Sequence, residues 1–206
     1  GTMVAKNTLD DGRVHTLFFD KEGILWIGTN QGGLNRFDTR TGEFTTFLDL
    51  KSGLHCVINI YEDKHGRFWA GTYLSGLFLF DRKTGTKRRF SEKDGLLFNS
   101  VFGIKEDVTG NIWIATARGL SRLDPKSNRV VNYAIPIGNV ESNDILYTGE
   151  SGRFNIATAG GLISFNPERM NTSAVPPELV IEAIGYTDAN NKDTLLQAYG
   201  RKQIEL

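Results

Sequence analysis

The sequence is poor in the residues that cross-link a chain, bind metals or give it a net charge. Of its 206 residues one is cysteine, Cys56, and three are histidine. A single cysteine forms neither an internal disulfide nor a cysteine-based zinc or iron–sulfur cluster. Lysine plus arginine and aspartate plus glutamate number 24 each, so the formal net charge at pH 7 is zero. This balance argues against a dedicated binder of nucleic acid or of an anionic membrane.

Long apolar runs are also missing. No run approaches the roughly 18 residues that a membrane-spanning helix needs, and Gly1-Thr2-Met3 does not begin the charged-then-apolar pattern of a signal peptide. That opening resembles a cloning remnant, so we expect the chain to be a piece of a longer protein. Glycine, by contrast, occurs 23 times and aromatic residues make up 11%. This combination favours short strands joined by tight turns.

A short motif recurs along the chain, in which a glycine is followed by a hydrophobic cluster. Successive glycines lie 43, 44 and 42 residues apart, a period typical of repeat architectures. An aspartate stands three residues before each of the first three glycines, and Gly-Leu follows nine or ten residues after all four. The four copies are Gly23-Ile24-Leu25-Trp26-Ile27, Gly66-Arg67-Phe68-Trp69-Ala70, Gly110-Asn111-Ile112-Trp113-Ile114 and the degenerate Gly152-Arg153-Phe154-Asn155-Ile156.

Each copy is predicted to fold as four short antiparallel strands. The Asp-x-x-Gly turn joins the first strand to the second, because aspartate accepts backbone N–H groups and glycine adopts positive φ. The second strand carries the tryptophan, and the third runs through Gly-Leu-x-x-Phe-Asp. Four short strands every 43 residues predict an all-β fold of β-propeller blades. First strands are expected at Val14 to Phe19, Val57 to Glu62 and Val101 to Glu106.

The repeat divides the chain into three parts. Residues 1–13 are expected to form a leader, and residues 14–170 four blades, at about 14–52, 57–95, 101–138 and 143–170. Residues 171–206 are expected to hold a linker and the incomplete start of a second β domain, since roughly 35 residues cannot bury a core alone. Strands are expected there at Leu179 to Ile184 and from Gln203 to Leu206, with a turn at Asp188 to Asp193.

The repeated residues are interpreted as structural. Trp26, Trp69 and Trp113 recur at one blade position, so we expect them to pack between adjacent blades. The glycines from Gly28 to Gly33 have the spacing of a phosphate-binding loop, but Leu34 stands where that loop requires lysine. We therefore reject a phosphate loop.

Ile24-Leu25-Trp26-Ile27-Gly28-Thr29 followed by Gly33-Leu34-Asn35-Arg36-Phe37-Asp38 resembles the two-component regulator propeller repeat. The tail from Pro176-Pro177-Glu178-Leu179-Val180-Ile181 is similar to the opening of the triple-tyrosine, immunoglobulin-like β-sandwich domain that follows such propellers. The resemblance implies the extracytoplasmic sensor of a membrane-bound hybrid histidine kinase, which detects oligosaccharides released from complex glycans. It places the chain in the periplasm, with its parent anchored in the inner membrane and the kinase outside this chain.

The number of blades raises a question of closure. Propellers close with roughly four to eight blades, and an open arc would expose apolar blade faces. We therefore expect a fragment of a larger ring or, if the piece is stable alone, a homodimer in which two arcs complete one ring. Contacts with nucleic acid or with a membrane are not expected of this piece.

No catalytic or metal-binding motif is recognised. Neither a Gly-x-Ser-x-Gly elbow nor His-Glu-x-x-His occurs. A metal site at His55-Cys56 would lack further ligands, so no metal, cofactor or catalytic residue is expected. Two alternatives stay open, an enzyme such as a propeller lyase or hydrolase acting in the central channel, and a protein-interaction scaffold.

Ligand contacts are expected where loops depart from the repeat. In propellers the loops between second and third strands and those between blades open on one face around the central channel. A sugar site combines a flat aromatic face with planar polar groups. The candidates by this criterion are Asn30, His55, Tyr73 and Arg118.

Overall fold

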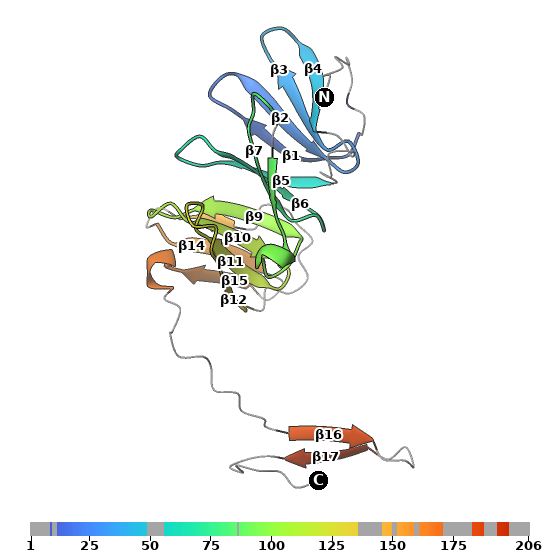
Figure 1. Cartoon of the computed structure of the whole chain (residues 1–206), viewed down its shortest axis with the longest axis vertical. Coiled ribbons are helices and arrows are strands. Elements are labelled where there is room, and N and C mark those ends of the chain that lie inside the picture. The colour runs from blue at the N-terminus through green and yellow to red at the C-terminus, as the bar shows by residue number, and fades with distance from the viewer. Residues whose placement is uncertain are drawn as a thin grey trace. The chain divides into compact units, whose positions relative to one another are not determined.

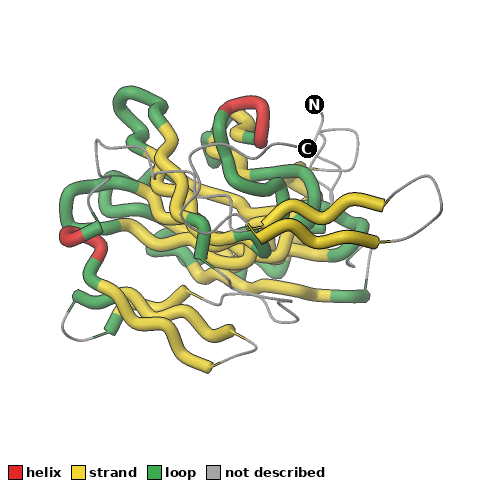
Figure 2. Tube along the Cα trace, turned by 90° about the horizontal axis from the view of Figure 1, so that it is seen from below, coloured by secondary structure: helices red, strands yellow, loops and turns green. Residues whose placement is uncertain are grey.

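The computed structural model describes residues 9, 12–48, 56–85, 87–135, 146–149, 152–158, 161–170, 183–187 and 193–197. The chain divides into two compact units, Gly1–Asn171 and Thr172–Leu206. The described residues are almost entirely strands and loops, with short helical turns at η2 (Glu92–Asp94) and η3 (Pro167–Arg169) (Figure 2). The predicted all-β fold is confirmed.

The first unit contains three four-stranded antiparallel sheets, each made of strands consecutive in the chain (Figure 1). The predicted bounds of the three first strands, β1, β5 and β9, are confirmed. The turn after β11 contains Asn128 at φ 60°, the left-handed conformation that asparagine tolerates. The strands are β1 (Val14–Phe19), β2 (Ile24–Thr29), β3 (Leu34–Asp38) and β4 (Glu43–Leu48); β5 (Val57–Glu62), β6 (Phe68–Thr72), β7 (Leu77–Phe80) and β8 (Lys87–Phe90); β9 (Val101–Glu106), β10 (Ile112–Thr116), β11 (Gly119–Leu123) and β12 (Val130–Tyr133).

The fourth sheet has three strands among the described residues, one fewer than expected. They are β13 (Leu146–Thr148), β14 (Phe154–Thr158) and β15 (Gly161–Phe165). After β15 the Asn166 side chain accepts a hydrogen bond from the Glu168 N–H at 2.9 Å, and Pro167 begins η3. Proline at the start of a helical turn and a capping asparagine both favour this turn, so here the chain turns into η3 and not into a strand.

Successive sheets contact one another through their first strands, as consecutive propeller blades do. β1 contacts β5, β5 contacts β9, and β9 contacts β13. Three hydrophobic clusters fill the spaces between successive sheets, and each contains one of the repeated tryptophans. Trp26 of the first sheet lies 5.2 Å from Phe68 of the second, between ring centroids. The predicted packing of the tryptophans between blades is confirmed.

The second unit contains one described hairpin, β16 (Ala183–Thr187) paired antiparallel with β17 (Asp193–Gln197). Of the turn expected at Asp188 to Asp193, residues 188–192 lie outside the described residues, and Asp193 begins β17. Of the strand expected at 179–184, Ala183 and Ile184 lie in β16, and residues 179–182 lie outside the described residues. The strand β17 was not expected, because Asp193-Thr194-Leu195-Leu196-Gln197 has no β-branched or aromatic pattern beyond its threonine. The strand expected from Gln203 lies outside the described residues.

Candidate functional site

The predicted ligand face is formed by the loops between second and third strands. Asn30 and Tyr73 occupy the same position in the first and second sheets, and each donates its backbone N–H to the segment before the first strand: Asn30 to Arg13 O at 3.1 Å and Tyr73 to Cys56 O at 3.0 Å. The repeat thus places both residues at the same end of their sheets.

The Asn30 side chain lies in a polar cluster between the first two sheets. Its Oδ1 is 3.3 Å from His15 Nε2 and accepts a hydrogen bond from Cys56 Sγ at 3.4 Å. Because Cys56 directly precedes β5, this contact joins the two blades at the predicted ligand face. Cys56 adopts a φ of 46°, a conformation that is uncommon for residues other than glycine.

Tyr73 and Arg118 differ in how far their side chains are engaged. The Tyr73 side chain is 50% exposed, whereas the Arg118 guanidinium lies 4.5 Å from the ring centroid of Phe98. Among the described residues no hydrogen bond links Asn30, Tyr73 and Arg118 to one another, and His55 lies outside the described ranges. The structure therefore places three of the four predicted residues on one face without joining them into a single cluster.

At the opposite end of the sheets, an aspartate contacts a tryptophan in each of the first three repeats. The tryptophan Nε1 donates to the Oδ2 of the aspartate six residues before it, at 2.7 Å for Trp26 to Asp20, 2.8 Å for Trp69 to Asp63 and 2.8 Å for Trp113 to Asp107. The Oδ1 of the same aspartate accepts backbone N–H groups of the turn. One carboxylate therefore holds both the turn and the inter-blade tryptophan.

The pKa values of two of these aspartates are lowered. Burial alone would raise the pKa of Asp20, but hydrogen bonds from Trp26 and from the Ile24 and Glu22 N–H groups, together with Arg82, bring it below its ordinary value. Burial also opposes ionisation of Asp107, and hydrogen bonds from Thr109, Trp113 and Asn111 again lower its pKa. Both groups are therefore carboxylates at neutral pH, the form that these hydrogen-bond donors stabilise.

Arg82 is a connecting residue that the sequence reasoning missed. Its guanidinium contacts Asp20 Oδ2 of the first sheet at 3.1 Å and Glu62 Oε1 of the second at 3.2 Å. Departure from the repeat could have revealed it, since Pro125 and Pro167 stand at the same place after the third strand of later repeats. Arg82 thus joins two blades at the end opposite the predicted ligand face.

No metal site was found in the part of the chain that the structure describes: no three His, Cys, Asp or Glu residues there are grouped to hold an ion. Within the same residues no helix is long and apolar enough to cross a membrane.

The family model of the two-component regulator propeller matches residues 8–31, 53–74 and 95–118. These segments begin before the first strand of each of the first three sheets and end shortly after the second. Three segments of the chain thus match the two-component regulator propeller repeat. "Histidine kinase P4" of Formosa agariphila is 26% identical over 184 residues, which cover 84% of this chain and 13% of that protein.

Solved structures share the propeller fold. The extracellular domain of a putative hybrid two-component system from B. thetaiotaomicron has a TM-score of 0.65 at 23% identity, over 93% of this chain and 30% of that one. A second such domain from the same organism has a TM-score of 0.60 at 19% identity, over 94% and 27%. An inactive virginiamycin B lyase from Staphylococcus aureus has a TM-score of 0.59 at 12% identity, over 97% and 75%. The propeller repeats of this chain thus span less than a third of the two-component proteins they match.

Proposed function

We propose that the chain is a non-enzymatic, ligand-sensing part of the extracytoplasmic region of a membrane-anchored hybrid two-component sensor. It recognises oligosaccharides derived from complex glycans and signals to a histidine kinase outside this chain. In a bacterium with two membranes this region lies in the periplasm.

One observation carries the proposal: three two-component regulator propeller repeats in phase with three four-stranded sheets. The similarity to a protein named as a histidine kinase, and to extracellular domains of hybrid two-component systems, supports the same role. The kinase and the membrane anchor of the parent protein are likewise proposed, because the chain spans less than a third of the length of these two-component relatives.

The predicted ligand face, which is formed by the loops between second and third strands and is called the loop face below, offers the groups that sugar recognition uses. Tyr73 presents a half-exposed aromatic ring, Asn30 a planar amide and Arg118 a guanidinium held against Phe98. Aromatic faces pack on the apolar faces of sugar rings, while amide and guanidinium groups bond hydroxyls. We assign the ligand contacts to these three residues and to His55.

Contacts between blades lie beside these residues, which gives a ligand a means to signal. Asn30 bonds Cys56 across the first pair of sheets, and Leu74 N donates to Ser100 Oγ at 3.1 Å across the second pair. A ligand that binds one arrangement of these contacts more tightly than another shifts the population of the two. The signal in this proposal is a change in blade packing.

The partners that we propose are further blades, supplied by the parent chain or by a second copy. Leu17 of β1 is 60% exposed, whereas Ile60 at the same place in β5 is buried. Leu162 of β15 is 70% exposed, whereas Leu34 at the same place in β3 is fully buried. Apolar positions that are buried inside the stack and exposed at its two ends are those that a neighbouring blade would cover.

Titration calorimetry of the chain against a panel of neutral and acidic oligosaccharides tests the proposal. The Tyr73→Ala variant should weaken binding about tenfold or more, because it removes a ring that packs on the sugar, and a loss of about 1.4 kcal/mol corresponds to a factor of ten in affinity. Tyr147→Ala is the matched control, since Tyr147 is 52% exposed on β13, away from the loop face. Absence of binding across the panel, or equal weakening by both variants, would contradict the proposal.

A further inference from the structure

The chain leaves the first unit through a short segment that folds back onto the third sheet. After β15, η3 (orange in Figure 1) leads to Met170, the residue before the last one of that unit. The Met170 side chain packs against the hydrophobic cluster that contains Trp113 of the third sheet and Phe154 of the fourth. Its carbonyl oxygen accepts hydrogen bonds from Tyr133 Oη at 2.8 Å and from Arg122 Nη1 at 3.3 Å. A residue that follows the fourth sheet is thus held by two side chains of the third.

Both of these side chains are positioned by the inter-blade tryptophan of the third sheet. The Tyr133 ring stacks on Trp113 with 5.3 Å between ring centroids and 21° between ring planes. The Arg122 guanidinium lies 5.7 Å from the Trp113 centroid and 5.9 Å from the Tyr133 centroid. Trp113 in turn donates its indole N–H to Asp107. We call Arg122 and Tyr133 the exit clamp, because they hold the chain where it leaves the first unit.

Comparison with the first two sheets shows that packing alone does not require the exit clamp. In each of the first three sheets the repeated tryptophan contacts an aromatic ring near the end of the fourth strand, and of these rings only Tyr133 carries a hydroxyl group. Opposite the tryptophan, the third strand carries Leu79 in the second sheet and Arg122 in the third. The aromatic pairs are Trp26–Phe47 at 4.9 Å, Trp69–Phe90 at 6.1 Å and Trp113–Tyr133 at 5.3 Å between ring centroids. Among these three sheets, the hydroxyl and the guanidinium therefore occur together only in the sheet onto which Met170 folds.

The exit clamp can open while the sheets stay folded. Burial raises the pKa of Tyr133 above its ordinary value, although the nearby Arg122 opposes this shift, so the hydroxyl keeps the proton that it donates. A single hydrogen bond contributes little to the stability of a whole unit, and a segment at the end of a unit opens more readily than its core. Arg169, which precedes Met170, is exposed. The bond between these two residues is therefore accessible to a protease once the clamp opens.

We infer that Arg122 and Tyr133 tie the chain beyond the propeller to the interface between the third and fourth blades, and release it when this interface loosens. The inference rests on the proposed signalling role, for which it names the place where a change in blade packing reaches the chain that leads to the second unit. Arg122 and Tyr133 are positioning residues, because they act through Met170.

Trypsin digestion of the whole chain tests the inference at one bond, Arg169–Met170. The rate of cleavage there follows the population of the opened segment. The Tyr133→Phe variant keeps the ring and removes the hydroxyl, which gives the third sheet the residue that the second carries as Phe90. It should be cut at this bond about fivefold faster or more, because a hydrogen bond to Met170 is lost. Mass spectrometry of the fragment that begins at Met170 measures the rate.

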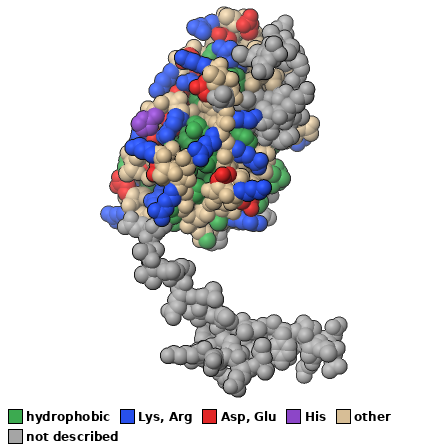
Figure 3. Space-filling model, viewed as in Figure 1, with side chains coloured by type: hydrophobic (Ala, Val, Ile, Leu, Met, Phe, Trp, Pro, Cys, Tyr) green, Lys and Arg blue, Asp and Glu red, His purple; other side chains and the backbone are tan. Residues whose placement is uncertain are grey.

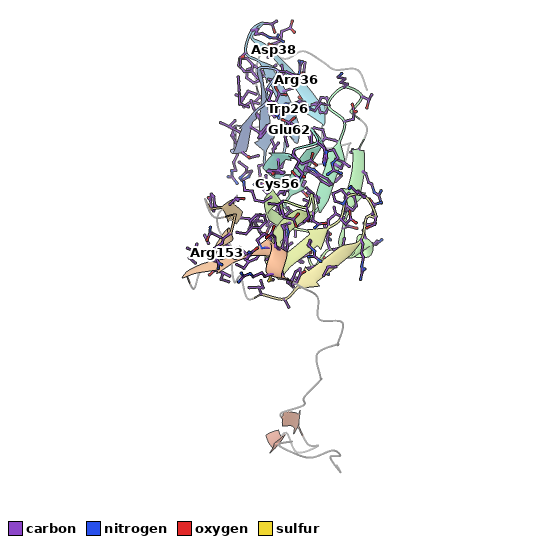
Figure 4. All side chains as sticks on the ribbon, turned by 90° about the vertical axis from the view of Figure 1, so that its left-hand side faces the viewer. Trp26, Arg36, Asp38, Cys56, Glu62 and Arg153 are labelled. Atoms are coloured by element: carbon purple, nitrogen blue, oxygen red, sulfur yellow. The ribbon has the colours of Figure 1, made fainter. Side chains whose placement is uncertain are left out.

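Cleavage at other bonds distinguishes opening of the clamp from unfolding of the unit. Lysine and arginine side chains are spread over the face shown in Figure 3, so trypsin has many other bonds to cut in an unfolded unit. Arg153, labelled in Figure 4, precedes β14 and donates through its guanidinium to Ser164 Oγ at 3.0 Å and Ser164 O at 2.9 Å. The rate of cleavage after Arg153 should change less than about twofold in Tyr133→Phe, because the clamp opens locally.

Tyr147→Phe is the matched control, because it removes a hydroxyl from a tyrosine that is 52% exposed on β13. It should leave the rate of cleavage at Arg169–Met170 unchanged. Circular dichroism checks folding. If Tyr133→Phe does not fold, Arg122→Leu replaces it, since leucine is the residue that the second sheet carries at this position.

Ile156→Val tests whether loosened blade packing releases the segment, because Ile156 of β14 is fully buried in the same hydrophobic cluster. This variant should be cut faster at Arg169–Met170, and by a smaller factor when Tyr133→Phe is already present, because the effects of coupled residues are not additive. Unchanged cleavage in Tyr133→Phe, an equal rise after Arg153, or factors that simply multiply would overturn the inference. No ligand takes part, so these outcomes are independent of whether the loop face binds sugars.

Discussion

At the scale of single residues, the contact between aspartate and tryptophan explains why these two residues of the repeat occur together. From the sequence, aspartate was assigned to the turn and tryptophan to packing between blades. The structure joins the two roles in one carboxylate. The fourth repeat lacks both residues at once: Gly149 stands at the aspartate position and Asn155 at the tryptophan position. Without the indole N–H, a buried carboxylate would lose a donor that supports its charge.

We predict that Asp107→Ala lowers the free energy of unfolding by about 2–4 kcal/mol, since it removes the turn's acceptor and leaves the buried Trp113 N–H without a partner. Asp81→Ala is the control, because Asp81 accepts N–H groups of an exposed turn but binds no indole. It should lower stability by about 0.5–1 kcal/mol. Urea unfolding followed by tryptophan fluorescence measures both, and equal losses would show that the indole contact adds nothing.

At the scale of the strands, small residues set how closely neighbouring blades approach. A Cβ atom on Gly71 of β6 would lie 2.7 Å from Val101 Cγ1 and 3.0 Å from Val101 O in the next sheet. At the same place in the third sheet β10 carries Ala115, and the strand beside it carries Gly103. Gly103 in turn approaches the fourth sheet, because a Cβ atom there would lie 2.8 Å from Leu146 Cβ.

The Gly71→Ala variant should destabilise the protein by about 1–3 kcal/mol, because it forces β6 and β9 apart in a packed interface. Ala115→Gly, the reverse change at the equivalent position, should lower stability by only about 0.5–1 kcal/mol through backbone entropy. Thermal unfolding of the two variants beside the original chain compares them. A Gly71→Ala variant as stable as the original would contradict the close packing described here.

At the scale of the whole molecule, the ends of the stack of blades differ from its interior. The position of Leu17 is filled by Ile60, Ile104 and Leu146 in the later sheets, and all three are buried. That of Leu162 is filled by Leu34, Leu77 and Leu120, all fully buried. A leucine thus occupies each of these positions at the two ends of the stack as well, although no described residue covers it there. This supports the proposal of further blades as partners.

Light scattering of the chain alone should therefore give twice the monomer mass, because a second copy can cover the exposed ends. The Leu17→Glu/Leu162→Glu variant should shift this equilibrium to the monomer, since burying an unpaired charge is unfavourable. Val108→Glu serves as the control, because Val108 is 67% exposed in the β9–β10 turn and not at an end. A wild-type monomer at all concentrations, or equal dissociation of the control, would contradict association through the ends.

The sequence by itself determined the repeat, the strand bounds of β1, β5 and β9 and the packing role of the tryptophans. These follow from local signals, since turn residues and hydrophobic clusters act over a few positions. Of the predicted site, the shared face of Asn30, Tyr73 and Arg118 followed from equivalent positions in the repeat. The contacts of Asn30 with Cys56 and of Arg118 with Phe98 did not, because they join residues of different segments.

Only the tertiary structure decided how one blade meets the next. The bridge from Arg82 to Asp20 spans 62 residues. Whether a repeated leucine is buried or exposed depends on the neighbouring sheet and not on its own strand. Contacts of this kind arise from the stacking of sheets, for which a strand's own sequence carries no local signal.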